Sequence, residues 1–187
     1  MLALKKKDKL LQVAITITFV LIGISLRLLP HPPNFTPIFA IALFAGVYLS
    51  KKIAFSLPLI IMLVSDIFIG TYEPKLMIFV YSSFILCVCL GLWLKKHKKW
   101  QTVLGGSILS AVIFFFITNL AVWVFTPWYA KTFSGIMQCY LMALPFFRNT
   151  LFGNIFYVTV FFGTYELVGI LVKKTIKPKS TNIFQIN

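Results

Sequence analysis

Long hydrophobic runs alternate along the chain with short stretches that carry lysine, proline or other polar residues. A helix needs about 20 largely apolar residues to cross the ~30 Å hydrocarbon core of a bilayer. The runs predict six helices, with approximate ranges 10–29, 37–50, 56–71, 76–94, 103–126 and 151–172. Residues 1–187 are therefore interpreted as a single all-α integral membrane domain, a bundle of six transmembrane helices.

The second predicted helix is too short to cross a bilayer on its own. Residues 37–50 would extend over about 21 Å at 1.5 Å per residue, less than the ~30 Å hydrocarbon core. The segment before it, residues 30–34, contains three prolines. Irregular backbone at membrane depth occurs only where it is packed in protein or lines a wet cavity. We therefore expect a cavity that opens to the outside, with this segment as its floor.

Residues 127–150 form an apolar, aromatic stretch that Pro127, Gly135 and Pro145 interrupt. The stretch is too short for two further crossings of the bilayer. It predicts a re-entrant or interfacial segment, with a structured outer loop, between helices five and six. Trp128 and Tyr129 are equally typical of the aromatic belt at a membrane interface, so this second interpretation stays open.

Basic residues are distributed unevenly among the connections. Fourteen of the 18 lie at the two termini or in the second and fourth connections. Because Lys and Arg favour the cytoplasmic side of a membrane, both termini are predicted to be cytoplasmic. Glu166, near that side, is predicted to pair with Lys173 or Lys174 or to contact a partner. The remaining basic residues fall on the opposite side: Arg27, Lys75, Lys131 and Arg148.

Composition changes this picture little. The chain is 59% hydrophobic and 12% charged, whereas soluble domains carry about 25% charged residues. A formal charge of +14 would point to nucleic acid in a soluble protein. Here the basic clusters between apolar runs indicate topology, so no nucleic acid is expected. Cys87, Cys89 and Cys139 are interpreted as buried, inert thiols, and neither a metal nor a cofactor is expected.

Polar side chains inside membrane spans are costly and usually face an interior site. Most of them fall near the predicted outer ends of the helices. Asp66 requires a cation, either Arg27, Arg148 or a positive group on a ligand, while Asn119 is also typical of an interhelical hydrogen bond. The candidate substrate-binding residues are Arg27, His31, Asn34, Asp66, Asn119, Trp123, Trp128, Arg148 and Asn149.

No catalytic constellation is evident in the sequence. Ser65 and Asp66 have no histidine at helical spacing, and His31 and His97 are predicted on opposite sides of the membrane. The chain contains no H-E-x-x-H, no P-loop and no G-x-G-x-x-G motif. We therefore expect that the protein is not an enzyme and does not hydrolyse ATP itself.

Four stretches resemble an uncharacterised bacterial family described as transport proteins. They are RLLPHPPNFTPIFAIALFAG (27–46), SDIFIG (65–70), FFFITNLAVWVF (114–125) and YAKTFSGIMQCYLMALPFFRNTLFGN (129–154). That family is similar to the substrate-binding S subunits of energy-coupling-factor (ECF) vitamin transporters. The resemblance implies an S-component-like bundle in the bacterial cytoplasmic (inner) membrane. It also implies an outer pocket covered by the loops after the first, third and fifth helices.

S subunits join a membrane coupling protein and two ATPase subunits, often through small residues on an early helix. The nearest analogue here is Ala42-x-x-x-Gly46 on the second predicted helix. The resemblance thus implies a coupling protein and ATPases as possible partners, besides the lipid bilayer and a small-molecule substrate.

The sequence therefore predicts a substrate-capture subunit for uptake of a small vitamin-like or polar micronutrient. Asp66, Asn119 and Arg148 would hold the ligand, and Trp123 or Trp128 would stack on it. A pocket with both an acid and a base suits a zwitterionic or amide-bearing ligand. Two alternatives stay open: a structural or assembly protein without a ligand, and a stand-alone secondary carrier.

Overall fold

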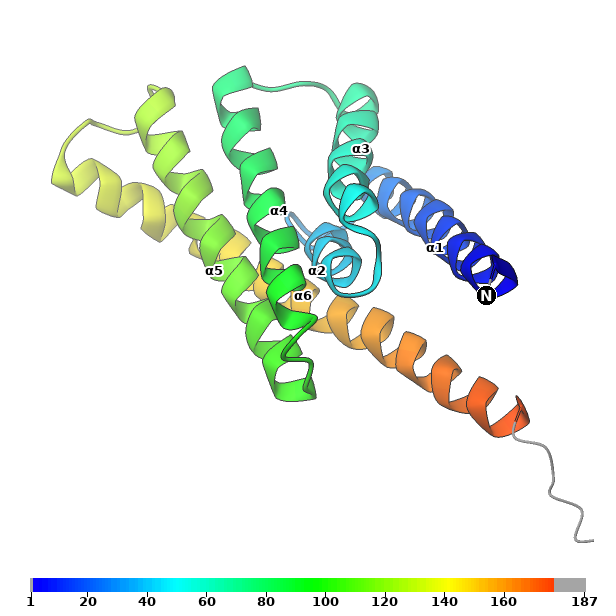
Figure 1. Cartoon of the computed structure of the whole chain (residues 1–187). Coiled ribbons are helices and arrows are strands. Elements are labelled where there is room, and N and C mark those ends of the chain that lie inside the picture. Colours follow the sequence, from blue (N-terminus) through cyan, green and yellow to red (C-terminus); the bar gives the residue numbers. More distant parts are fainter. Residues whose placement is uncertain (1, 177–187) are drawn as a thin grey trace, which may run out of the picture.

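A computed structural model describes the fold of residues 2–176 and the side chains of residues 9–172. Within this part of the chain the secondary structure is entirely helical (Figure 1). The helices are α1 (Leu2–Leu28), α2 (Ile38–Tyr48), α3 (Lys51–Ile69), α4 (Pro74–Leu94), α5 (Trp100–Phe125) and α6 (Phe133–Ile176).

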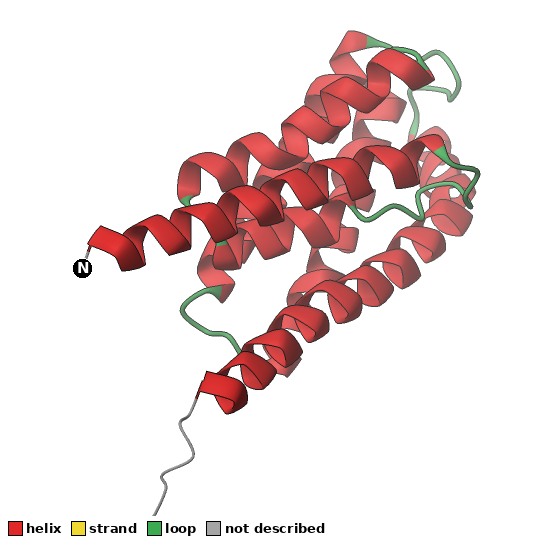
Figure 2. Cartoon of the chain, turned by 90° about the vertical axis from the view of Figure 1, so that its right-hand side faces the viewer, coloured by secondary structure: helices red, strands yellow, loops and turns green. Residues whose placement is uncertain are grey.

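The connections between the helices gather at two opposite ends of the bundle (Figure 2). The terminal end comprises the start of α1, the end of α6, and the connections at residues 49–50 and 95–99. The loop end comprises the three longer connections, residues 29–37, 70–73 and 126–132. The start of the first helix and the end of the last helix therefore lie on the same side of the molecule.

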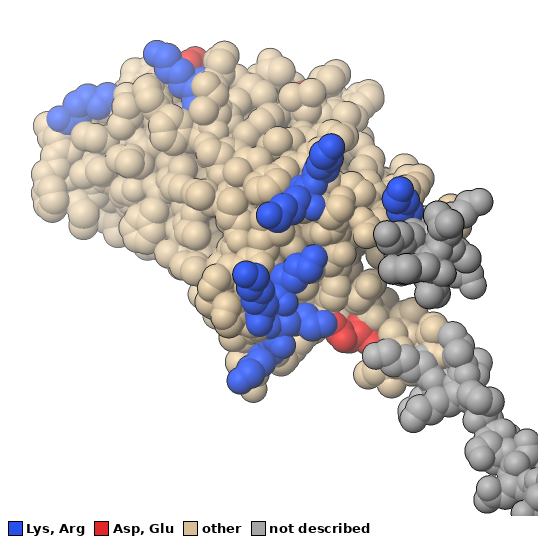
Figure 3. Space-filling model, in the orientation of Figure 1, with Lys and Arg blue, Asp and Glu red and all other residues tan. Residues whose placement is uncertain are grey.

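Basic side chains follow the same division into two ends. Figure 3 shows a cluster of Lys and Arg over the terminal part of the surface and a few more at the opposite edge. The terminal end carries Lys51, Lys52, Lys95, Lys96, Lys98 and Lys99. The described residues thus keep the uneven grouping of positive charge that the sequence shows.

The short helix α2 lies in the core of the bundle. Every residue from Ile38 to Val47 is buried, as expected for a helix that is apolar on all sides. Its 11 residues extend over about 16 Å at 1.5 Å per residue. Five helices of the described chain are long and apolar enough to cross a membrane, and α2 is not among them. The prediction of six spanning helices therefore becomes five candidate spans that surround a short buried helix.

Helices α2 and α4 approach each other most closely at Gly46 and Gly91. A Cβ at Gly46 would lie 2.6 Å from the carbonyl oxygen of Val88, and one at Gly91 would lie 2.5 Å from that of Leu43. Glycine alone permits this backbone contact. The Ala42 and Gly46 pair, considered above as a docking motif, is buried inside the bundle, so that interpretation is wrong.

Helix α6 is one continuous helix of 44 residues, which corrects the predicted start near residue 151. It begins at Phe133 and includes Pro145, and its first part packs on α5 through Tyr140, whose hydroxyl donates to the carbonyl of Phe116 at 2.9 Å. At 1.5 Å per residue the helix is about 66 Å long, roughly twice the ~30 Å hydrocarbon core. Residues 133–150 are thus helical continuations of the last span, and only residues 126–132 form a loop.

Candidate functional site

Two cavities with volumes of ≈ 260 and ≈ 270 Å³ lie at the loop end of the bundle. The first, here the α5–α6 cavity, is lined mainly by those two helices. The second, the α3–α4 cavity, is lined from α1 to α5. Asn34 and Phe114 line both cavities, so the two adjoin. Each loop of the loop end contributes to their walls, through Asn34, Tyr72 and Trp128.

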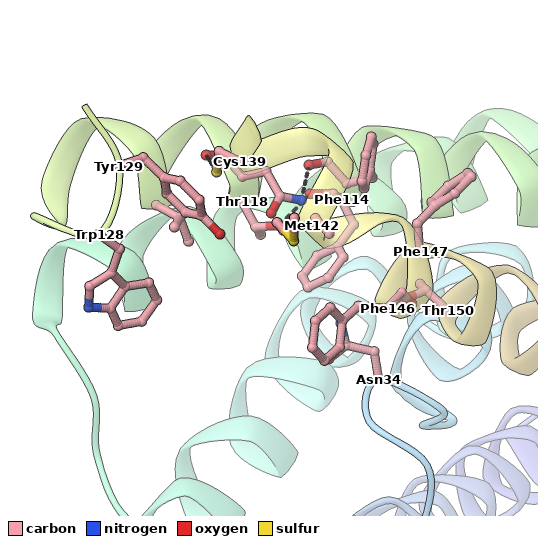
Figure 4. A pocket seen from close by; sticks show the side chains of 14 residues that line it. Asn34, Phe114, Thr118, Trp128, Tyr129, Cys139, Met142, Phe146, Phe147 and Thr150 are labelled. Atoms are coloured by element: carbon pink, nitrogen blue, oxygen red, sulfur yellow. Dashed lines mark hydrogen bonds between the residues drawn. The ribbon is translucent and has the colours of Figure 1, made fainter. Parts of the chain in front are cut away.

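Aromatic side chains dominate the α5–α6 cavity (Figure 4). Trp128 and Tyr129 lie on one side of it, and Phe114 and Phe146 lie on the other. The polar residues of the lining are all uncharged, namely Asn34, Thr118, Asn119 and Thr150. The cavity therefore offers ring surfaces and a few hydrogen-bonding groups but no full charge.

Helix backbones already satisfy part of this polar lining. The Thr118 hydroxyl donates to the carbonyl of Phe114 at 2.8 Å, and Asn119 Nδ2 donates to the carbonyl of Phe115 at 2.8 Å. Because a hydroxyl keeps two acceptor lone pairs and an amide keeps its oxygen, both residues can still accept hydrogen bonds. The bond of Asn119 stays within α5 and does not link two helices, so the interhelical alternative is wrong.

The buried charge of Asp66 is neutralised by Arg27. Arg27 Nη2 lies 2.8 Å from Asp66 Oδ1, and the two side chains are 14% and 3% exposed. The hydroxyl of Tyr81 donates to the other carboxylate oxygen at 2.8 Å. Of the three partners predicted for Asp66, the structure therefore shows Arg27. Both carboxylate oxygens are occupied, and Asp66 lines neither cavity.

Arg27 is the one charged residue that lines the α3–α4 cavity. Its Nη1 also donates to Ser65 Oγ at 2.7 Å and contacts the Met62 sulfur. A guanidinium has five N–H donors, and three of those of Arg27 are used within the described residues, which leaves two without an acceptor there. Across the cavity, burial raises the pKa of Tyr72 to about 12, and its hydroxyl therefore stays protonated at neutral pH.

Trp123 supports the 126–132 loop instead of facing a cavity. Its Nε1 donates to the carbonyl of Ala130 at 2.9 Å. The amine of Lys131 donates to the carbonyl of Trp123 and, at 2.8 Å, to that of Thr126. Of the two tryptophans predicted to stack on a ligand, Trp128 lines the α5–α6 cavity and Trp123 does not.

Three further candidate residues lie outside the cavity walls. His31 is exposed, with Nδ1 2.7 Å from the carbonyl oxygen of Leu29. Arg148 is also exposed and lines neither cavity. Asn149 Nδ2 donates to the carbonyl of Pro33 at 3.0 Å, which ties the 29–37 loop to α6. The structure does not bring Asp66, Asn119 and Arg148, the three residues predicted to hold one ligand, to the same cavity, because only Asn119 lines one.

At the terminal end, Glu166 pairs with Lys98 of the 95–99 connection, at 2.6 Å. The hydroxyl of Tyr48, at the end of α2, donates to the same carboxylate. The side chains of Lys173 and Lys174, which were predicted as partners, lie outside the described residues. The contact with Lys98 therefore adds a long-range link that the sequence did not predict.

The cysteines agree only in part with the prediction of buried thiols. Cys87 and Cys139 are buried, but Cys89 is exposed on the outside of the bundle. Among the described residues, no group of three His, Cys, Asp or Glu side chains could hold a metal ion.

The phenylalanines and threonines of the α5–α6 cavity are not among the residues predicted from the sequence, whereas Asn34, Asn119 and Trp128 are. Phe114 and Thr118 lie four residues apart on α5, and Phe146 and Thr150 repeat that spacing on α6. Residues four apart share one face of a helix. Both pairs line the α5–α6 cavity, so the repeated Phe-x-x-x-Thr spacing is the signal that could have found them.

Comparison with known proteins places most of the chain in one family. The family of unknown function DUF6580 matches residues 7–178, which include nearly all of the described helices. Neither the curated proteins nor the solved structures yield a match. The role of the cavities therefore has to be argued from their own geometry and chemistry.

Proposed function

The chain belongs to the family of unknown function DUF6580, and we propose that it is a membrane-embedded subunit that captures a small molecule for uptake. The substrate class is a scarce vitamin-like micronutrient. Five helices long and apolar enough to cross a membrane support the location in a bilayer, which we propose is the bacterial cytoplasmic membrane. The S subunits that the sequence resembles act in this way.

One observation carries the proposal, namely the pair of adjoining cavities at the loop end. Small-molecule sites typically occupy about 300–1,000 Å³, with mostly apolar walls and a few polar groups. At ≈ 260 and ≈ 270 Å³ each cavity is slightly smaller than this range, but the two share two wall residues and together offer one site of this size and character. All three loops of one end contribute to the walls, which suits a site that is entered from one side of the membrane.

We assign the loop end to the outside, since the basic cluster of the terminal end favours the cytoplasm. Single cysteines are introduced at His31, Glu73 or His97 after replacement of the native cysteines; all three positions are exposed. In intact cells, a membrane-impermeant thiol reagent is expected to label positions 31 and 73. Position 97 should react only after permeabilisation. Labelling of position 97 in intact cells would place the cavities on the cytoplasmic side instead.

A capture subunit needs a source of energy, and this sequence has no ATP-binding motif. We therefore propose a membrane coupling protein and ATPase subunits as partners. The test is affinity purification in mild detergent, followed by mass spectrometry of the proteins that co-purify. Recovery of ATPases with the chain is the expected result. Recovery of the chain alone would contradict a role as the capture subunit of an ATP-driven importer.

A further inference from the structure

The walls of the two cavities differ in charge. The α5–α6 cavity is lined by uncharged residues only, whereas the α3–α4 cavity contains the guanidinium of Arg27. Asp66 faces neither space, because Arg27 and Tyr81 occupy its oxygens. The ion pair thus presents its positive member to the cavity and keeps its negative member in the protein.

This asymmetry argues against a cationic or zwitterionic ligand. Among the described residues no carboxylate lines either cavity, so a positive group on the ligand would lose part of its hydration without gaining an ion-pair partner. The three connections of the loop end and the adjoining parts of the helices carry two acidic residues, Asp66 and Glu73, against four basic ones, Arg27, Lys75, Lys131 and Arg148. An anionic group would instead meet a positive local field and the two N–H donors of Arg27 that lack a protein acceptor.

The α5–α6 cavity favours a flat ring. Its walls include the rings of Phe114, Phe115, Phe146, Phe147, Trp128 and Tyr129. Aromatic rings attract one another beyond the effect of burying their area. A saturated ring of the same size would forgo that attraction. The amide of Asn34 makes no hydrogen bond within the described residues and lies where the two cavities meet, so it can bind a polar group between ring and anion.

We propose that the substrate is a flat aromatic compound with a single carboxylate. The ring occupies the α5–α6 cavity, and the carboxylate lies beside Arg27 in the α3–α4 cavity. The planar fork of a guanidinium matches the geometry of a carboxylate. This inference rests on the proposed capture function and narrows it to one chemical class.

Three matched probes test the class: phenylpropionate, phenylpropionamide and cyclohexylpropionate. They share a chain length and differ in the charge or in the ring. The shift in Tm of the purified protein is measured against the concentration of each probe. Phenylpropionate is expected to bind about tenfold more tightly than its amide, as loss of a charged hydrogen bond implies. It should also bind more tightly than the cyclohexyl acid.

Two double variants test whether Arg27 causes the preference for the acid over the amide. R27M/D66N removes the charged pair at the cavity, and E73Q/K75M removes one acid and one base at the same end, where neither residue lines a cavity. The preference for the acid over the amide should disappear in R27M/D66N and persist in E73Q/K75M. Should R27M/D66N fail to fold, R27K keeps the ion pair and should bind phenylpropionate several-fold more weakly.

Four results would overturn the inference. Equal binding of acid and amide by the wild-type protein would show that the site does not require an anion. Equal binding of the two acids would show that it does not require an aromatic ring. If both R27M/D66N and R27K still prefer the acid as strongly as the wild-type protein does, Arg27 is not the residue that binds the carboxylate. Absence of a shift with all three probes would reject the class outright. None of these results decides whether ATPases co-purify with the chain, so the capture function is judged separately.

Discussion

Replacing Arg27 by methionine is expected to lower the free energy of unfolding by about 3–5 kcal/mol, the usual cost of breaking a buried ion pair. Asp66, only 2% exposed, would be left as a carboxylate with the hydroxyl of Tyr81 but without a cation. Burial of an unpaired charge is costly, and the cost is larger in the interior of a membrane protein. Thermal or denaturant unfolding in mild detergent measures the effect.

The control for this prediction is the double variant R27M/D66N. It removes both charges and leaves no unpaired carboxylate, so it should recover most of the stability lost in R27M. Unfolding of R27M at the wild-type temperature would contradict the account. In that case the ion pair would contribute nothing to the stability of the fold.

Substitution of Gly46 or Gly91 by alanine is expected to destabilise the protein by about 3 kcal/mol, at the upper end of the usual cost of overpacking. The added methyl group would lie 2.6 Å from the carbonyl oxygen of Val88 or 2.5 Å from that of Leu43. Backbone atoms cannot rotate away as a side chain can. Helices α2 and α4 would have to separate in the middle of the core, and the yield and Tm of the purified protein report the result.

Gly105 provides a matched control for this prediction. It lies inside α5, and a Cβ there would meet nothing within 4 Å. Gly105→Ala should therefore raise stability by roughly 0.5–1 kcal/mol, because alanine loses less backbone entropy than glycine in a helix. Equal stability of the Gly46, Gly91 and Gly105 variants would show that α2 and α4 do not pack as closely as the structure describes.

Hydrophobic periodicity and charge grouping predict much of this fold because both signals are local. The runs locate all six helices, and the prolines at 30–33 mark the loop at the cavities. The predicted start of α6 lies too late in the sequence because Pro145, which lies inside the helix, is typical of a helix end. A proline inside a helix loses one hydrogen bond and introduces a steric clash. The packing of Tyr140 and Phe147 on α5 favours continuation of the helix at that point.

The candidate site was harder to predict because its chemistry depends on partners far apart in the sequence. Arg27 and Asp66 were both selected for the cost of burying charge, but only the structure shows that they neutralise each other. Arg148 has the same residue type and lies near the same end, yet it is exposed. Burying an aromatic ring has no comparable cost in free energy, so the aromatic lining residues do not stand out in the sequence. Phe115 and Phe147, which have no threonine four residues later, are therefore indistinguishable from lipid-facing residues in a chain with 20 phenylalanines.

Native mass spectrometry of the protein, purified from its own membranes in mild detergent, tests the central claim most directly. Ala143 lines the α5–α6 cavity and is 8% exposed, so Ala143→Phe should fill the cavity. Leu141, on the same helix, is 56% exposed, and Leu141→Phe adds a ring that points away from it. The wild-type protein and Leu141→Phe should each carry one small molecule that Ala143→Phe lacks. A wild-type protein that shows only its own mass, or a bound molecule that Ala143→Phe retains, would contradict the account.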